Sequence, residues 1–176
     1  RVNIHDGIES TLMILQNRLK AFAHKLGGDC PGLNIVKNYG ELPQIECYAG
    51  QLNQVFMNLL SNAIDALEEC WLGKQSRREQ LPQDRPTIEI ETRVLEGDRV
   101  EIKISDNGPG ISPETIQKLF DPFFTTKPIG KGTGLGLSIS YQIVVDRHGG
   151  QMVCNSEPGR GAEFRIEIPV RQPEFT

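Results

Sequence analysis

The chain has 176 residues, of which 38% are hydrophobic and 24% are charged, and its formal net charge is −4. This length and composition predict one soluble globular domain with a sizeable core. The acidic balance argues against a general nucleic-acid binder, and no apolar run is long enough to cross a membrane. The four cysteines are scattered without a CxxC pair, so we expect reduced thiols in a cytoplasmic protein, with no disulfide framework and no zinc site.

Hydrophobic periodicity predicts an alternation of helices and strands, separated by turns rich in glycine and proline. In chain order we expect a helix at 6–24, extended segments at 33–39 and 45–48, a helix at 51–69, a polar surface loop at 70–86, strands at 87–95 and 99–105, helices at 112–119 and 135–147, and strands at 151–155 and 162–170. This order predicts an α/β (α+β) two-layer sandwich, in which one mixed, mostly antiparallel sheet has its helices on one face.

The helix at 51–69 carries an unusual polar stripe opposite its apolar face. The stripe is formed by Gln51, Gln54, Asn58, Asn62 and Asp65. Asn is a poor residue for a helix interior, yet Asn58 and Asn62 stand one turn apart on the same side. Amide oxygens on a rigid helix suit Mg²⁺, and amides can also contact phosphate. An ordinary polar surface with two indifferent Asn residues is the alternative.

Asp106 ends an apolar strand and is followed by the tight turn Asn107-Gly108-Pro109-Gly110. A partly buried carboxylate at a strand end needs a hydrogen-bond donor, and the exocyclic amine of adenine is a suitable one. The glycines of the turn leave the backbone open to whatever lies above it. The alternative is an ordinary Asp-Asn-Gly turn.

A second glycine-rich segment runs directly into the predicted helix at 135–147. Its alternate positions are Gly130, Gly132, Gly134 and Gly136. Bare amides at a helix N-terminus bind anions, and Lys127 and Lys131 add positive charge. The spacing matches neither a Walker A loop nor a dinucleotide fingerprint. We therefore favour a phosphate site of another kind, with a structural hinge as the alternative.

Aromatic residues precede this segment and a histidine follows the helix. Phe120, Phe123 and Phe124 gather around an Asp-Pro pair and are suited to anchor a loop, including a mobile lid that closes on nucleotide. His148 stands at the predicted C-terminus of the helix, where a cation interacts favourably with the helix dipole.

Together these motifs resemble the catalytic ATP-binding (CA, HATPase_c) domain of two-component sensor histidine kinases, within the GHKL superfamily of gyrase, Hsp90, histidine kinase and MutL ATPases. NLLSNAIDA is similar to the N box, DNGPG to the G1 box, FDPFFTTK to the F box and GKGTGLGLSI to the G2 box, and EPGRGAEF resembles the last glycine-containing motif. The motifs occur in the family order and span nearly the whole chain. The resemblance implies the Bergerat fold, with one catalytic domain at 1–176 and an ATP lid at 120–133.

The resemblance also implies a site. Asn62 would ligate a Mg²⁺ ion that bridges the ATP phosphates, Asp106 would accept from the adenine amine, and Asn58, Asn62 and Lys131 would be catalytic. The nucleotide-binding residues would be Asn58, Asn62, Asp65, Asp106, Gly108, Gly110, Ile111, Lys127, Gly132, Thr133, Gly134, Leu135, Gly136 and Leu137. Two positions depart from the family pattern. Asp65 stands where many members carry a basic residue, and Ala162 stands where a Thr is frequent.

Hydrolytic members of the wider family place a Glu four residues before the metal-binding Asn, where this chain has Asn58. An amide cannot act as a general base, so the resemblance implies a site that keeps the γ-phosphoryl group available for transfer. The acceptor would be a histidine on a dimerisation domain of the same protein, which would then phosphorylate a response-regulator receiver domain.

We expect this chain to be a piece of a longer protein that lacks the histidine domain and cannot autophosphorylate alone. Any membrane anchor would lie in the missing regions. Two alternatives remain open, namely a Ser/Thr protein kinase of the same fold, as in anti-sigma factors, and a nucleotide-sensing module without catalysis. Acid-stable phosphorylation would favour the first, and binding without transfer would favour the second.

Overall fold

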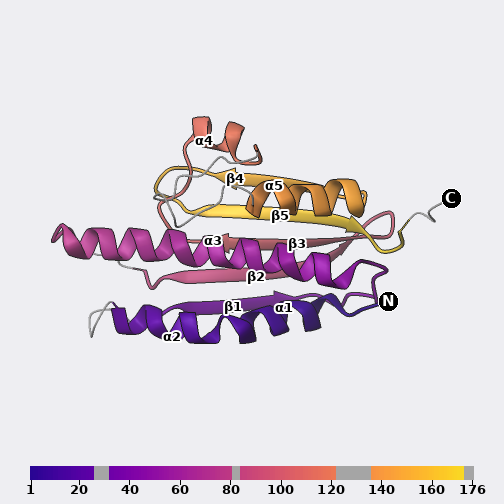
Figure 1. Ribbon diagram of the computed structural model, residues 1–176, viewed down its shortest axis with the longest axis horizontal. Helices are drawn as coiled ribbons and strands as arrows, with labels where there is room; N and C mark the ends of the chain where they lie inside the picture. Colours follow the sequence, from indigo (N-terminus) through magenta and orange to yellow (C-terminus); the bar gives the residue numbers. More distant parts are fainter. Residues whose placement is uncertain (26–31, 81–83, 122–135, 173–176) are drawn as a thin grey trace.

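A computed structural model describes residues 1–25, 32–80, 84–121 and 136–172 of the chain. Figure 1 shows two layers, with α1, α3 and α5 lying over one face of a single sheet. The elements in chain order are α1 (Ile4–Ile14), α2 (Gln16–Lys25), β1 (Asn34–Tyr39), α3 (Ala49–Ser76), β2 (Thr87–Leu95), β3 (Arg99–Asp106), α4 (Pro113–Lys118), α5 (Gly136–Tyr141), the π-helix η2 (Gln142–Arg147), β4 (Gln151–Ser156) and β5 (Ala162–Pro169).

The sheet has five strands in the order β1-β2-β3-β5-β4. Only the pairing of β1 with β2 is parallel, and the other three pairings are antiparallel. The predicted fold class is therefore confirmed. The hairpin between β2 and β3 also matches its prediction, and Gly97 and Asp98 in its turn take the positive φ angles that a tight turn requires.

The core lies between the sheet and the helices. Strands β2, β3 and β5 bury alternate side chains, and Ile90, Ile102 and Ile166 are each fully shielded from solvent. The apolar face of α3 covers them, and each buried side chain of this size contributes about 1.5 to 3 kcal/mol through the hydrophobic effect. Within the described residues, no helix combines the length and the apolar character that a membrane span demands.

The predicted surface loop at 70–86 is wrong in its first part, because α3 continues to Ser76. Trp71 lies one turn beyond Leu67 on the apolar face and is only 4% exposed, so it extends the buried stripe. Lys74 and Gln75 are good helix formers. The polar composition of the segment reflects the exposed side of a helix rather than a loop.

Other boundaries differ in smaller ways. The predicted helix at 6–24 is divided at Leu15 into α1 and α2, and the extended segment at 45–48 forms only an isolated bridge between Ile45 and Val2. The described part of the helix predicted at 135–147 begins as α5 and continues as the π-helix η2. A π-helix has no distinct pattern of apolar residues, so the sequence does not predict it.

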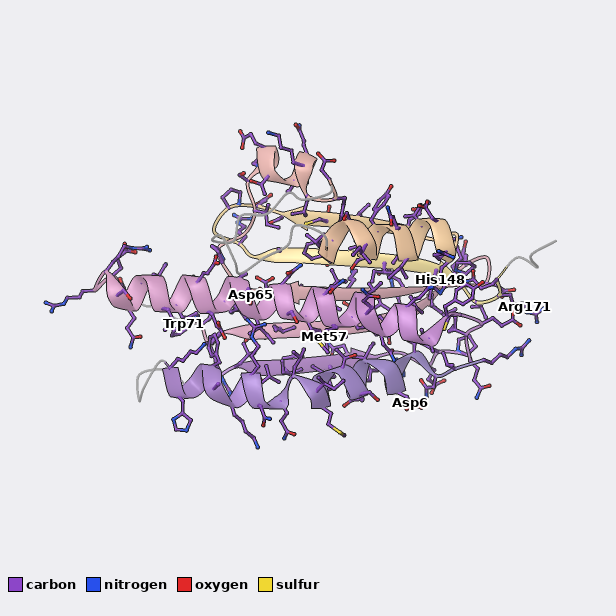
Figure 2. The ribbon with its side chains drawn as sticks, in the orientation of Figure 1. Asp6, Met57, Asp65, Trp71, His148 and Arg171 are labelled. Atoms are coloured by element: carbon purple, nitrogen blue, oxygen red, sulfur yellow. The ribbon has the colours of Figure 1, made fainter. Side chains whose placement is uncertain are left out.

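His148 follows η2, where Figure 2 labels it, and its side chain is completely buried. Its Nδ1 donates to the carbonyl of Ile143 at 2.7 Å, and its Nε2 accepts from the backbone N–H of Tyr48, the residue before α3, at 3.1 Å. Burial lowers the pKa of the imidazole. The expectation of a favourable cation at this helix end is therefore wrong, because a neutral ring ties η2 to the start of α3.

Candidate nucleotide-binding site

Asp106 is the last residue of β3 and faces the helix-covered side of the sheet, between Ile88 and Ala162 of the neighbouring strands. Its carboxylate accepts a hydrogen bond from the backbone N–H of Gly108 at 2.8 Å. Burial raises the pKa of Asp106 from 3.8 to about 6, against the opposing effect of backbone hydrogen bonds from Gly108 and Ala162. At neutral pH the group is a carboxylate with spare acceptor capacity in a poorly solvated place.

The turn after Asp106 interlocks with the turn between β4 and β5. The N–H of Gly159 donates to the Pro109 carbonyl at 2.7 Å, and the N–H of Ile111 donates to Ser156 Oγ at 2.7 Å. Ser156 in turn donates to the Gly161 carbonyl at 2.7 Å. The sequence offered no signal for Ser156, since a serine at a strand end is common.

Two glycines allow the turns to approach this closely. Gly110 has a φ of 79° and Gly161 a φ of 82°, values that residues with a side chain rarely adopt. A Cβ atom at Gly110 would collide with the Glu157 carbonyl, and one at Gly161 would collide with the Asp106 carbonyl. Close backbone packing and a positive φ are therefore sufficient to explain why residue 110 is a glycine.

The same turn approaches α3. A Cβ atom placed on Gly108 would lie 2.8 Å from the Asp106 carboxylate and 3.5 Å from the methyl group of Ala66 in α3. Ala66 lies one turn beyond Asn62 on the same helix. The structure thus brings the Asp106 turn beside the part of α3 that carries the Asn stripe.

Asn58 connects α3 with the start of α5. Its side-chain Nδ2 donates to the Gly136 carbonyl at 3.1 Å and to Ser140 Oγ at 3.0 Å. Leu137, the next residue of α5, is half-buried against the core. The predicted site residues Asn58 and Gly136 are therefore in direct contact, and Ser140 joins them without having been predicted.

Asn62 and Asp65 lie further along the stripe, and both are half-buried. Figure 2 shows Asp65 near the middle of α3. Its carboxylate forms an ion pair with the guanidinium of Arg18 in α2, which also lies 3.7 Å from a carboxylate oxygen of Glu68. The structure therefore neutralises the acidic residue of the stripe with a cation from a neighbouring helix.

The remaining predicted site residues, Lys127, Lys131, Gly132, Thr133, Gly134 and Leu135, lie outside the described residues, as does most of the predicted lid at 120–133. At the described edge of that segment, the ring of Phe120 lies against the ring of Tyr141 in α5, with 5.2 Å between the centroids. This contact agrees with an anchoring role for Phe120.

The residues that the structure describes contain no group of three or more His, Cys, Asp or Glu side chains suited to a metal ion. Mg²⁺ does not require such a group, because it commonly keeps several waters and binds one or two protein oxygens together with substrate phosphates. The amide oxygens of the α3 stripe are hard ligands of this kind. The donor set therefore fits a Mg²⁺ ion that arrives with a nucleotide.

Comparison with known proteins shows that the chain is similar in sequence to kinases. Sporulation kinase E of Bacillus subtilis (strain 168) is 37% identical over 132 residues, which cover 75% of this chain and 15% of that protein. The chain thus spans less than a fifth of this relative.

Two solved structures are also similar. The nucleotide-free catalytic domain of histidine kinase ThkA matches with a TM-score of 0.73 and 26% identity, covering 97% of this chain and 96% of that one. Full-length ShkA in complex with AMPPNP matches with a TM-score of 0.73 and 25% identity, covering 98% of this chain and 31% of that one. The described fold is thus that of histidine kinase catalytic domains.

A family model described as "Histidine kinase-, DNA gyrase B-, and HSP90-like ATPase" matches residues 48–172. The match begins just before α3 and ends after β5, so it includes both the Asn stripe and Asp106. It covers well over half of the chain, and the chain therefore belongs to the family of histidine kinase-, DNA gyrase B- and HSP90-like ATPases.

Proposed function

We propose that this chain is the catalytic ATP-binding domain of a sensor histidine kinase. In this proposal it binds Mg-ATP and transfers the γ-phosphoryl group to a histidine on a dimerisation domain of the same protein, which then phosphorylates a response-regulator receiver domain. The family match supports ATP binding, and the kinases among the relatives support phosphoryl transfer. The observation that carries the proposal is the approach of the Asp106 turn to the Asn-bearing side of α3.

Asp106 recognises the base in this proposal. The adenine amine donates to the carboxylate, which is ionised at neutral pH although burial raises its pKa to about 6. A hydrogen bond to a charged acceptor contributes about 1.5 to 3 kcal/mol, more than one between neutral groups. The locked turn at Gly108–Ile111 keeps the carboxylate in place before the nucleotide arrives.

Asn62 and Asn58 act on the phosphate side. Their amide oxygens would hold Mg²⁺ directly or through water, and the ion would neutralise charge on the phosphates during transfer. Asp65 stands near these residues, and its ion pair with Arg18 limits its repulsion of the triphosphate. Lys127 and Lys131 are proposed to add positive charge from the glycine-rich segment.

Transfer rather than hydrolysis is favoured by the residue at position 58. A neutral amide cannot take a proton from water, and the Nδ2 of Asn58 is already engaged with α5. Phosphoryl transfer depends mainly on positioning and charge stabilisation, so a site without a general base can still serve it when another domain supplies the nucleophile.

The direct test mixes this chain with radiolabelled Mg-ATP and the dimerisation domain of the full-length protein, expressed separately. We expect acid-labile label on the dimerisation domain and none on this chain alone. A dimerisation domain with its acceptor histidine changed to Ala is the matched control and should stay unlabelled. Acid-stable label would indicate a Ser/Thr kinase. Binding of ATP with no transfer to the cognate domain would indicate a nucleotide-sensing module and contradict the proposal.

A further inference from the structure

Three groups from α3 and α5 form a closed hydrogen-bonded triangle. Asn58 Nδ2 donates to the Gly136 carbonyl at 3.1 Å and to Ser140 Oγ at 3.0 Å, and Ser140 Oγ donates to the Gly136 carbonyl at 2.8 Å. Ser140 is completely buried. The triangle stands at the described end of the glycine-rich segment, and two of its members, Asn58 and Gly136, are predicted nucleotide-binding residues.

The chemistry of the triangle determines the orientation of the Asn58 amide. A backbone carbonyl can only accept, so the atom of Asn58 that faces Gly136 must be the nitrogen. Ser140 gives its single hydrogen to the same carbonyl, so its oxygen is left to accept from Asn58. Both amide hydrogens of Asn58 are thereby committed to α5. Because the nitrogen faces the Gly136 carbonyl, the amide oxygen Oδ1 is directed away from it.

This orientation decides what Asn58 can offer to a ligand. An amide whose hydrogens are committed can only accept, which suits Mg²⁺ or a metal-bound water and does not suit a phosphate oxygen. The geometry points to Ser140 as a positioning residue that turns the Asn58 oxygen toward the metal side of the nucleotide and holds the first turn of α5 on α3. This inference rests on the proposed function, since it assigns a role within the same site.

The test is a double-mutant cycle on nucleotide affinity. The change Ser140→Ala is made in the wild-type and in the Asn58→Ala background, and the dissociation constant for AMPPNP is measured by calorimetry with Mg²⁺ and with EDTA. If Ser140 acts through Asn58, its effect should depend on Asn58 and on the metal.

A matched control is available in α1. Thr11 is buried and its hydroxyl donates to the Gly7 carbonyl at 2.9 Å, four residues earlier, as Ser140 does toward Gly136. Thr11→Val therefore removes the same kind of hydrogen bond away from the triangle. Ser140→Thr keeps the hydroxyl and should restore most of the affinity. Ser140→Cys, with a weakly bonding thiol, gives a graded loss if the Ala variant does not fold.

We expect Ser140→Ala to weaken Mg²⁺-dependent binding about three- to tenfold, the effect of one lost hydrogen bond. In the Asn58→Ala background the further loss should be below about twofold, and Thr11→Val should bind as the wild type does. The inference would be overturned if Ser140→Ala lost the same affinity in the wild-type and Asn58→Ala backgrounds, or the same affinity with Mg²⁺ as with EDTA. An equal loss of affinity in Thr11→Val would also overturn it. Absence of AMPPNP binding by the wild type would instead overturn the proposed function, and the inference with it.

Discussion

At the scale of single residues, Asp106 must be ionised to accept strongly from adenine, yet its burial disfavours the ionised form. Burial at the end of β3 raises its pKa to about 6, so the carboxylate is ionised at neutral pH at a cost in free energy. For stability, this group contributes most below its unfolded pKa of 3.8, and the contribution is lost as the pH rises through about 6. A ligand that donates a hydrogen bond to the ionised form offsets this cost.

The first prediction concerns nucleotide affinity against pH. We expect the affinity for ATP to fall as the pH decreases through about 6, because a protonated Asp106 is a weaker acceptor for the adenine amine. Asp106→Asn should weaken binding about 10- to 100-fold at pH 7, the effect of losing a hydrogen bond to a charged group. Calorimetric titrations between pH 5 and 8 measure both effects.

Asp106→Asn also serves as the control for protonation of the nucleotide phosphates, which affects binding to the wild type and to the variant alike. Asp106→Asn should retain the part of the pH dependence that belongs to the phosphates and lose the part centred near 6. An identical pH profile in the wild type and the variant would exclude Asp106 from the binding equilibrium.

At the scale of elements, the second prediction tests the true end of α3. Trp71 is 4% exposed and belongs to the buried face of the helix. Trp71→Ala should lower the free energy of unfolding by about 3 to 5 kcal/mol, as truncation of a large core aromatic does. Glu69→Ala, an exposed change two residues earlier, should cost less than about 0.5 kcal/mol. Equal small effects in urea denaturation would place Trp71 in a solvated segment and contradict the helix boundary.

The third prediction concerns His148, which ties η2 to the N-terminus of α3. Its Nε2 must remain unprotonated to accept from Tyr48, and burial keeps its pKa below 6.5. Well above pH 6.5 the ring of His148 is neutral in both the folded and the unfolded chain, so its hydrogen bonds contribute fully to stability. As the pH falls below 6.5, His148 becomes protonated in the unfolded chain while it stays neutral in the folded chain. The free energy of unfolding therefore decreases by up to about 1.4 kcal/mol per pH unit.

His148→Gln isolates this effect from other titrating groups. Asp106 shifts stability in the opposite direction as the pH falls from about 6 to 3.8, so the wild-type curve alone mixes the two. The difference in urea midpoint between wild type and variant should be largest at pH 7.5 and shrink toward pH 5.5. A difference that is constant with pH would show that folding does not lower the pKa of His148.

These elements also show how far the sequence could be interpreted. Alternating residues predicted β2, β3 and β5 closely, because a half-buried strand imposes a period that is visible in composition. The sequence does not mark the end of α3, because Trp71 is the only fully buried residue of the helix after Leu67. The role of His148 was missed because its partner, Tyr48, is distant in the chain, and the helix C-terminus alone favoured a cation.

The candidate site divides in the same way. Asn58 and Asp106 could be selected from the sequence because each is unusual in its local context. Asn is unfavourable inside a helix, and a carboxylate at the end of an apolar strand needs a hydrogen-bond donor. Ser140 and Ser156 could not, since their hydroxyls act on backbone groups of other segments or of an earlier turn. Only the folded arrangement shows which carbonyl or amide each serine serves.

At the scale of the whole molecule, the site draws on segments far apart in the chain. Asn58 comes from α3, Asp106 from β3 and Gly136 from α5, and the sheet order places β3 next to β5 rather than β4. None of these segments can form the site without the others. A ligand that contacts all of them binds the folded chain only, so its binding free energy adds to the free energy of unfolding.

The last prediction follows from this linkage. Mg-ATP at about 100 times its dissociation constant should stabilise the chain by about 2.7 kcal/mol, which raises the melting temperature by about 5 to 10 °C for a domain of this size. Asn62→Ala should lose the part of the rise that depends on Mg²⁺, so that its melting temperature with ATP is the same with Mg²⁺ as with EDTA. Gln54→Ala removes an exposed amide from the same stripe and should behave like the wild type. A full Mg²⁺-dependent rise in Asn62→Ala would mean that the metal reaches the nucleotide without this residue.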